Sequence, residues 1–405
     1  MLDDRQKKIL FAVFFIAASI LFGYILYRMF FPNVNVSTPM AEEERNGQLP
    51  VAGNGGPTST DGTKPQNGVL QPSIPSVRPQ PTSSHTRILN DAETRNVSPT
   101  PDGQGVRYYN PDDGRFYRVR ADGTIETMSD RQFFNVAAVS WGNKTDKNIL
   151  TFEDGKHGYY NFETNAYVPL PDYWQNFRFS PDDARVAEKS IGVDPDNRYL
   201  ITTNPDGTEI KPINAMGENS DLVHVNWVPH GQIIAWTETG EPQSDGQQIL
   251  MVGQHKENFK GLIAPGNDFL PNWSPGGKTV LFSVWSDATQ NQPSIWVTSG
   301  EAGSIGAGRK NLHINTWADK CAWGSESVVF CAVPQNLPEN AGIDRSSAKD
   351  LPDDIYKIDL SGGQITKIST PSQTRPVANP VISKDLKTFT FTDTANGKLY
   401  QYDLL

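Results

Sequence analysis

The chain has 405 residues, of which 46 are acidic and 36 basic, so that its formal net charge is −10. This balance argues against a nucleic-acid partner and against an anionic membrane surface, because both require a clustered basic face that the sequence lacks. The composition changes so sharply along the chain that we predict one folded domain with appended segments, rather than two or three domains.

The first segment is apolar. Residues 9–27 contain no charged side chain, and as a helix they would extend about 28 Å, close to the thickness of a bilayer's hydrocarbon core. We therefore expect a single transmembrane helix over residues 9–31, with the basic residues before it holding a stub of residues 1–8 in the cytoplasm. A cleaved signal peptide is the alternative, but the first weak small-residue cleavage site lies near Ala41, far from the apolar core.

Residues 32–105 are dominated by Pro, Gly, Ser, Thr, Asn and Gln. A segment of this composition cannot bury enough apolar surface to offset the entropy lost on ordering. We expect a disordered linker with a root-mean-square span of about 45–50 Å. The linker would place the folded domain outside the cell membrane, in the periplasm or at the cell surface.

From Val106 onward the pattern is strand, turn, strand, with Gly, Asp, Asn and Pro in the turns. One phrase recurs, in which an aromatic residue precedes a small turn and a second apolar run follows. Its best copies cover residues 179–183 and 273–278, and successive copies lie about 38 to 59 residues apart. This spacing fits one four-stranded blade per repeat, and it predicts an all-β domain over residues 106–405, a β-propeller of six or seven blades, with seven preferred.

The two ends of this domain are expected to meet. The C-terminal end supplies strands near residues 378–382, 388–392 and 398–403, one short of a blade. A ring has no free edge only if its termini join. We therefore expect the first predicted strands, over residues 106–128, to complete the last blade or to form an incomplete seventh.

The turn motif resembles that of the TolB-type propellers, which are Trp-Asp-repeat-like and related to the propeller that precedes the hydrolase domain in dipeptidyl-peptidases of the prolyl oligopeptidase group. The resemblance covers about 300 residues, and the copies at Trp141 and Trp323 lack the proline. It implies the propeller fold and a tendency to bind proteins or peptides, by analogy only.

The only cysteines are Cys321 and Cys331, on the two strands that flank one of these turns. Cross-strand neighbours approach closely enough for a disulfide, which an extracytoplasmic location permits. Free, buried cysteines are the alternative. The six histidines are scattered without a zinc-binding spacing, so we expect no metal and no cofactor.

A catalytic motif is not apparent. The chain offers no Gly-x-Ser-x-Gly nucleophile elbow, and its adjacent carboxylates, such as Asp182 with Asp183, stand in turns. We predict a protein that is not an enzyme. A propeller can still assemble carboxylates from separate blades at its centre, so an enzyme acting on glycan stays open as an alternative.

Aromatic and acidic residues gather in the loops that share one face of the predicted propeller. These loops lead into the first strand of a blade or join its second and third strands, and they include residues 238–245 and the longest insertion, 334–353. Such residues suit the recognition of a peptide or sugar, although each could instead pack under its own loop or cap a turn. The candidate binding residues are Tyr173, Trp174, Asp221, Asp268, Trp285, Asp287, Trp317 and Asp319.

Taken together, these features predict a membrane-tethered, non-catalytic scaffold of the cell envelope. Its propeller would bind a protein, a peptide or an envelope polymer. The alternatives are an extracytoplasmic propeller that acts on or binds glycan, and a structural subunit of an envelope complex.

Overall fold

The computed structural model describes residues 86–243, 246–369 and 374–404. The predicted cytoplasmic stub, the transmembrane helix over residues 9–31 and most of the linker lie outside the described residues. Among the described residues, no helix is long and apolar enough to cross a membrane.

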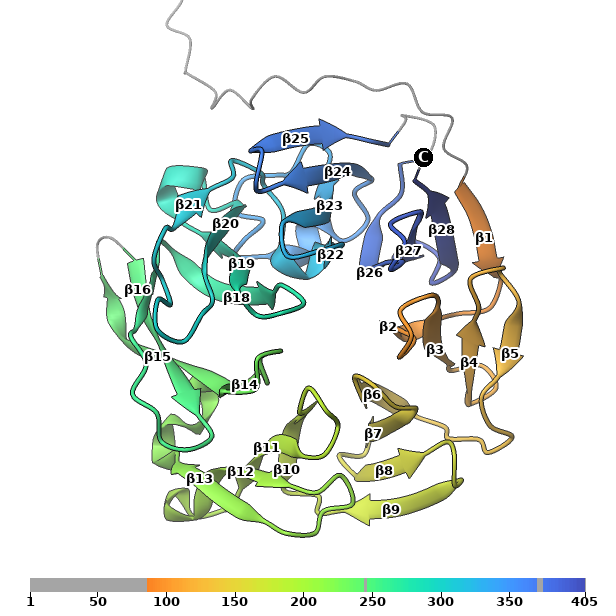
Figure 1. Ribbon diagram of the computed structural model, residues 1–405, viewed down its shortest axis with the longest axis vertical. Helices are drawn as coiled ribbons and strands as arrows, with labels where there is room; N and C mark the ends of the chain where they lie inside the picture. The colour runs from red at the N-terminus through yellow and green to blue at the C-terminus, as the bar shows by residue number, and fades with distance from the viewer. Residues whose placement is uncertain (1–85, 244–245, 370–373, 405) are drawn as a thin grey trace, which may run out of the picture. The chain divides into compact units, whose positions relative to one another are not determined.

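Seven four-stranded antiparallel sheets surround a common axis and form a β-propeller, as predicted (Figure 1). In blades 1 to 6 the strands follow chain order from the innermost strand outward. Blade 1 holds β2 (Arg95–Pro99), β3 (Val106–Asn110), β4 (Arg115–Val119) and β5 (Ile125–Thr127). Blade 2 holds β6 (Val136–Trp141), β7 (Lys147–Phe152), β8 (His157–Asn161) and β9 (Ala166–Leu170). Blade 3 holds β10 (Trp174–Phe179), β11 (Val186–Ile191), β12 (Arg198–Thr203) and β13 (Lys211–Ala215).

The second half of the ring repeats this plan. Blade 4 holds β14 (Val223–Val225), β15 (Ile233–Gln243), β16 (Gly246–Gly253) and β17 (Leu262–Ala264). Blade 5 holds β18 (Asn267–Trp273), β19 (Thr279–Trp285), β20 (Pro293–Ser299) and β21 (Lys310–Asn311). Blade 6 holds β22 (Cys321–Trp323), β23 (Val328–Pro334), β24 (Asp353–Asp359) and β25 (Gln364–Lys367). Blade 7 holds β26 (Val377–Ile382), β27 (Thr388–Asp393) and β28 (Leu399–Asp403), and its outermost strand is β1 (Thr86–Asn90).

The ring closes through β1, which pairs antiparallel with β28 in a register that sets Thr86 opposite Tyr402. This corrects two expectations. The propeller includes residues before Val106, since β1 and β2 belong to it and fall inside the segment predicted as linker. The strands predicted over residues 106–128 do not complete the last blade; they form blade 1 together with β2. Both β1 and β2 are half-buried to exposed and lack an apolar alternation; each is paired through its backbone with a neighbouring strand, and Leu89 and Val97 pack against a core cluster.

Apolar side chains fill the spaces between neighbouring blades. Between blades 1 and 2, for example, Phe116 and Phe133 pack against Leu150, Tyr160 and Phe162. The rings of Phe133 and Tyr160 meet edge to face with centroids 4.9 Å apart. Aromatic contacts of this kind contribute about 0.5–1.5 kcal/mol beyond the area they bury, and they hold the blades at fixed angles.

Four innermost strands carry the same irregularity. Asn96, Asn176, Asp268 and Asn379 each adopt a left-handed backbone conformation, with φ between 49° and 60°, at a shift of register with the second strand. Asn and Asp tolerate this conformation better than other residues with a side chain. The repeat therefore gives these four strands a similar bulge beside the axis.

The propeller has two faces of different character. The face that we call the entry face is formed by loops that lead into the innermost strands and loops that join second to third strands. All five 3-10 helices of the described residues lie on it: η1 (Pro195–Asn197), η2 (Gly217–Leu222), η3 (Asp287–Thr289), η4 (Ala318–Lys320) and η5 (Arg345–Ala348). The remaining loops form the opposite face.

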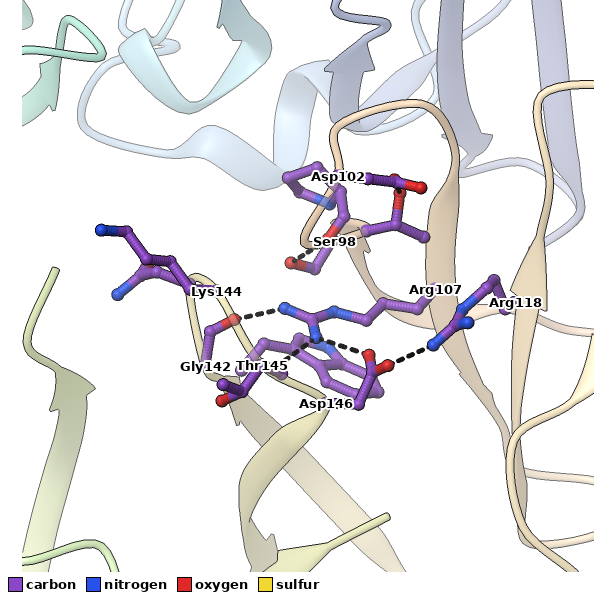
Figure 2. A network of polar contacts seen from close by, with 12 residues as sticks. Ser98, Asp102, Arg107, Arg118, Gly142, Lys144, Thr145 and Asp146 are labelled. Carbon is purple, nitrogen blue, oxygen red and sulfur yellow. Dashed lines mark hydrogen bonds and ion pairs between the residues drawn. The ribbon is translucent and has the colours of Figure 1, made fainter. Parts of the chain in front are cut away.

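On the opposite face, polar side chains join one blade to the next (Figure 2). The buried guanidinium of Arg107, in β3, donates hydrogen bonds to the carbonyls of Gly142 and Thr145 and pairs with Asp146 at 3.1 Å. It also lies over the ring of Trp141, 4.5 Å from the centroid. The same loop of blade 2 is fixed to blade 3.

That second connection is made by Asp183, which is buried and has a φ of 60°. Its carboxylate accepts hydrogen bonds from the backbone N–H of Lys144 at 2.8 Å and from the hydroxyl of Thr145 at 2.7 Å. Blades 5 and 6 are joined on this face by Glu326, which accepts a hydrogen bond from Ser274 at 2.8 Å. Polar side chains of the opposite face thus join blades 1 to 3, and blades 5 and 6, to one another.

Candidate functional site

Three carboxylates from different blades come together on the entry face, and we call them the carboxylate cluster. They belong to Glu238 in β15, Asp268 at the bulge of β18 and Asp319 in η4. Burial raises the pKa of Asp268, the nearby carboxylates of Glu238 and Asp319 raise it further, and the guanidinium of Arg345 partly offsets this rise. Asp268 is nevertheless exposed, so the group stays accessible to a ligand. The surrounding protein displaces enough water to shift its pKa.

Glu238 is held by side chains of its own blade. Its carboxylate accepts a hydrogen bond from Gln247 at 2.7 Å and lies 3.7 Å from Nε2 of His224. The imidazole of His224 stacks on Trp236, with centroids 4.0 Å apart. Burial lowers the pKa of His224, so the imidazole is uncharged at neutral pH and does not neutralise the cluster.

Asp319 is the member of the cluster that already holds a cation. Arg345, in η5, donates a hydrogen bond to its carboxylate at 2.8 Å. The guanidinium also lies over the ring of Trp317, 4.7 Å from the centroid. The site can therefore accommodate a guanidinium between a carboxylate and an indole face.

Arg345 belongs to the long insertion of blade 6, residues 335–352, which packs on the neighbouring blade. The backbone N–H of Gly342 donates to the carbonyl of Asn291 at 2.7 Å, and the side chain of Gln292 donates to the carbonyl of Leu337 at 2.6 Å. A small core forms beneath the insertion from Trp317, Ala341 and Ala348, with leucines around it. These contacts fix the insertion to blade 5.

The structure places the predicted binding residues in different environments. Asp268 and Asp319 join the cluster, while Tyr173, Asp221 and Asp287 are exposed elsewhere on the entry face. Trp174 and Trp317 are only 2% and 3% exposed, which excludes them as surface anchors and corrects the prediction. Trp174 belongs to the core between blades 2 and 3, and Trp317 packs beneath the insertion. Trp285 is half-buried against Gly342 of the same insertion.

Three residues of the site were not among those predicted individually. Glu238 was part of a predicted loop, but His224 and Arg345 were not expected to take part. The pairing of His224 with Trp236 could have been found by aligning β14 with β15, where the two residues are direct cross-strand partners. The place of Arg345 depends on how the insertion folds, for which the sequence holds no repeat.

The two cysteines are joined as predicted. Cys321 and Cys331 are direct cross-strand partners in β22 and β23, and a disulfide connects them. Among the described residues, no group of three or more His, Cys, Asp or Glu side chains is arranged to hold a metal ion.

Chemically, the arrangement suits a cation. Arg345 pairs with Asp319, neutral His224 lies near Glu238, and aromatic rings lie beneath both the imidazole and the guanidinium. Carboxylates hydrogen-bond ammonium and guanidinium groups strongly, and aromatic faces attract the same cations.

Comparisons with known proteins establish the fold. No family model and no curated protein matches the sequence. Among solved structures, an oligogalacturonate lyase from Vibrio parahaemolyticus superposes with a TM-score of 0.54 at 12% identity, covering 79% of this chain and 93% of that one. The β-propeller domain of Cps50 (Swd1) from Myceliophteria thermophila gives a TM-score of 0.53 at 9% identity, over 79% of this chain and 100% of that one.

The tricorn protease gives a TM-score of 0.51 at 12% identity, over 80% of this chain. The chain spans about a third of that protein's length, since 34% of it is covered. At these identities the similarity shows the propeller fold alone, and the neighbours differ in function. TolB from Acinetobacter baumannii is 15% identical over 54% of this chain, with a TM-score of 0.40, so a specific kinship with TolB stays a prediction.

Proposed function

We propose that the protein is a membrane-tethered, non-catalytic binding module of the cell envelope. Its propeller would use the entry face to hold a cationic group of a protein or peptide partner. The tether and the location outside the membrane rest on the apolar segment over residues 9–27 and the linker that follows it.

One observation carries this proposal. Asp268 lies near the carboxylates of Glu238 and Asp319, and in the described part of the chain neither Asp268 nor Glu238 has an arginine or lysine within ion-pairing distance; burial raises the pKa of Asp268 most, and the two carboxylates add to the rise. A cation that bound there would remove the repulsion among the three carboxylates. Arg345 supports the choice of ligand, because it is an intramolecular example of a guanidinium in this position.

A peptide library displayed on phage tests the proposal. The bait is the full chain in lipid nanodiscs, and the comparison is the variant Glu238→Gln with Asp268→Asn and Asp319→Asn. We expect the selected peptides to be enriched in Lys and Arg and to bind the variant at least about tenfold more weakly, a loss of about 1.4 kcal/mol. Peptides that bind both proteins equally would refute the proposed site.

A matched control removes the same charge from the opposite face. The variant Asp122→Asn with Glu163→Gln and Asp206→Asn neutralises three exposed carboxylates in loops that join third to fourth strands. If long-range attraction to the net negative charge were the whole effect, this control would weaken binding as much as the cluster variant does. We expect it to bind like the unaltered chain at physiological salt, where exposed charges more than about 8 Å apart are largely screened.

An enzyme that acts on glycan is the second candidate. The observation that favours it is the raised pKa of Asp268 beside a second carboxyl group, that of Glu238, because a carboxyl with a raised pKa can serve as a general acid. Release of reducing sugar from soluble envelope glycan by the full chain, lost on Asp268→Asn, would support the enzyme. Unchanged glycan together with peptide binding would support the binding module.

A further inference from the structure

Three exposed apolar side chains lie in adjoining loops on the entry face of blades 3 and 4. Tyr173 is 53% exposed, Val193 is fully exposed and Leu222 is 41% exposed. The carbonyl of Tyr173 accepts a hydrogen bond at 2.8 Å from the N–H of Ile191, two residues before Val193. Leu222 ends η2, which packs against η1 in the turn that carries Val193. We call these three residues the apolar crescent.

The backbone fixes the crescent in place. Asp194 caps η1 by accepting a hydrogen bond from the N–H of Asp196 at 3.0 Å, and Arg198 donates to the carbonyl of Gly192 at 3.1 Å. The turn therefore presents Val193 to solvent from a defined conformation. Burying an exposed apolar side chain is favourable by about 25 cal/mol per Å², so a preformed surface of this kind favours binding.

The crescent is surrounded by acidic side chains. Five exposed carboxylates lie in the same loops, and none of them forms an ion pair with a residue of the described part: Asp172, Asp194, Asp196, Glu218 and Asp221. Exposed Lys156 lies within electrostatic reach of Asp172, whereas two other basic side chains nearby are directed to the backbone. Lys189 is buried and donates to the carbonyl of Ser220 at 3.0 Å, and Arg198 bonds carbonyls of its own turn. The surface is thus apolar with a negative rim.

Lys189 also shows how close the crescent lies to the carboxylate cluster. Asp221 supports the charge of Lys189, and the charge of Lys189 in turn disfavours protonation of His224, so both groups lie within its electrostatic reach. Asp221 adjoins Leu222 of the crescent, and His224 contacts Glu238 of the cluster. One extended partner could therefore contact both.

We propose that the apolar crescent docks a polypeptide segment of a partner in which apolar and basic side chains alternate. The inference rests on the proposed function and names the partner's chemistry. The apolar side chains would cover Tyr173, Val193 and Leu222, while the basic ones pair with the rim and reach the cluster. Charge complementarity favours this occupant over an anionic membrane surface, which the rim would repel, and over a second copy of this chain, whose two-fold related rim would face its own charge.

The experiment measures binding of three labelled peptides of equal length to the full chain in nanodiscs of zwitterionic lipid. The peptides alternate Leu with Lys, Leu with Glu, or Gly with Lys. We expect only the Leu/Lys peptide to bind tightly, and we expect added salt to weaken it. Equal binding of the Gly/Lys peptide would overturn the inference, because the apolar surface would then contribute nothing. Equal binding of the Leu/Glu peptide would overturn it as well.

Variants locate the contact. The triple variant Tyr173→Ser, Val193→Ser, Leu222→Ser is expected to weaken the Leu/Lys peptide by about tenfold or more. The control variant Ile125→Ser, Ile210→Ser, Ile263→Ser removes side chains of 38%, 56% and 41% exposure that lie away from the entry face, and it is expected to leave binding unchanged. Unchanged binding by the crescent variant would overturn the inference.

The cluster variant separates this inference from the proposed function. If neutralising the carboxylate cluster abolishes binding and the crescent variant has no effect, the proposed function stands and the crescent proposal falls. If only the crescent variant has an effect, the crescent proposal stands and the assigned cluster site falls. Two other results would identify another occupant and overturn the proposal. The unaltered chain could self-associate, or bind anionic vesicles, in a way that the crescent variant does not.

Discussion

The buried ion pair between Lys320 and Asp353 supports the part of the ring that carries the site. Lys320 Nζ lies 2.7 Å from a carboxylate oxygen of Asp353, and their side chains are 8% and 0% exposed. The same oxygen accepts a hydrogen bond from the N–H of Val377 in blade 7 at 2.6 Å. The pair thus connects η4, which carries Asp319, to β24 and to the next blade.

We predict that Lys320→Met destabilises the propeller by about 3–5 kcal/mol, since it leaves the carboxylate of Asp353 buried without its counterion. Unfolding entropy is about 2.1 cal/mol/K per residue, so for a propeller of about 300 residues that unfolds cooperatively the melting temperature should fall by about 5–8 °C. Calorimetry and urea denaturation of the full chain measure the change. Lys320→Met combined with Asp353→Asn removes both charges and should recover much of the loss.

The dependence on pH provides a second readout. Burial raises the pKa of Asp353, and Lys320 opposes that shift, so loss of Lys320 raises the pKa further. A carboxyl that binds its proton more tightly in the folded state is least destabilising at low pH, and its cost grows as pH rises above the unfolded pKa of about 3.9. The cost of Lys320→Met should therefore shrink on acidification from pH 7 to pH 5.

A neighbouring pair is the control. Lys367 lies 2.7 Å from Asp354, but their side chains are 31% and 13% exposed, and Lys367→Met should cost about 1 kcal/mol or less after solvent screening. If Lys320→Met cost no more than Lys367→Met, or if its cost did not change with pH, the argument from a desolvated pair would be wrong.

Three further predictions concern other parts of the ring. Burial raises the pKa of Glu188 well above its usual range, so Glu188→Gln should raise the free energy of unfolding at neutral pH. The gain should grow by at most about 1.4 kcal/mol per pH unit above the unfolded pKa of the carboxyl, and thermal melts across pH measure it. Gly342→Ala would place a Cβ 2.4 Å from that of Trp285, so urea melts should show a loss of about 1–3 kcal/mol, whereas Gly303→Ala, with open space around it, should be nearly neutral. Arg107→Lys cannot reproduce the guanidinium contacts between blades 1 and 2 and should cost about 1–3 kcal/mol in the same assay.

The sequence predicts the repeat well because the turn between the first two strands of a blade has strict local requirements. The turn at Ser180 is an example, where the side chain accepts a hydrogen bond from the N–H of Arg185 at 2.9 Å and donates one to Asp182 at 2.6 Å. Such turns are built from residues close in the chain, so the local amino-acid sequence is enough to predict them. The seven-bladed count follows from them once the closing strand is known.

The closing strand and the site depend on contacts between distant residues. Thr86 is paired with Tyr402, and no pattern within residues 86–90 predicts this pairing, because the strand adds one partly buried side chain, Leu89, to the core and is otherwise joined to β28 through its backbone. Trp174 was predicted as a surface binding residue but is buried. An aromatic residue beside a turn suits both a surface anchor and a core residue, and only the packing of blade 2 against blade 3 decides between them.

Arg345 bears on how selective the entry face can be. Its pairing with Asp319 already satisfies one member of the carboxylate cluster, whereas Asp268 and Glu238 have no arginine or lysine within ion-pairing distance in the described part of the chain. A weakly held cation would gain little by displacing Arg345, since that exchange replaces one charged hydrogen bond with another. A partner therefore gains most by placing its cation against Asp268 and Glu238 and leaving Arg345 in place. Arg345→Ala should accordingly broaden the range of cationic peptides that bind, because it frees Asp319 and the face of Trp317, and a panel of Lys and Arg peptides would measure the change.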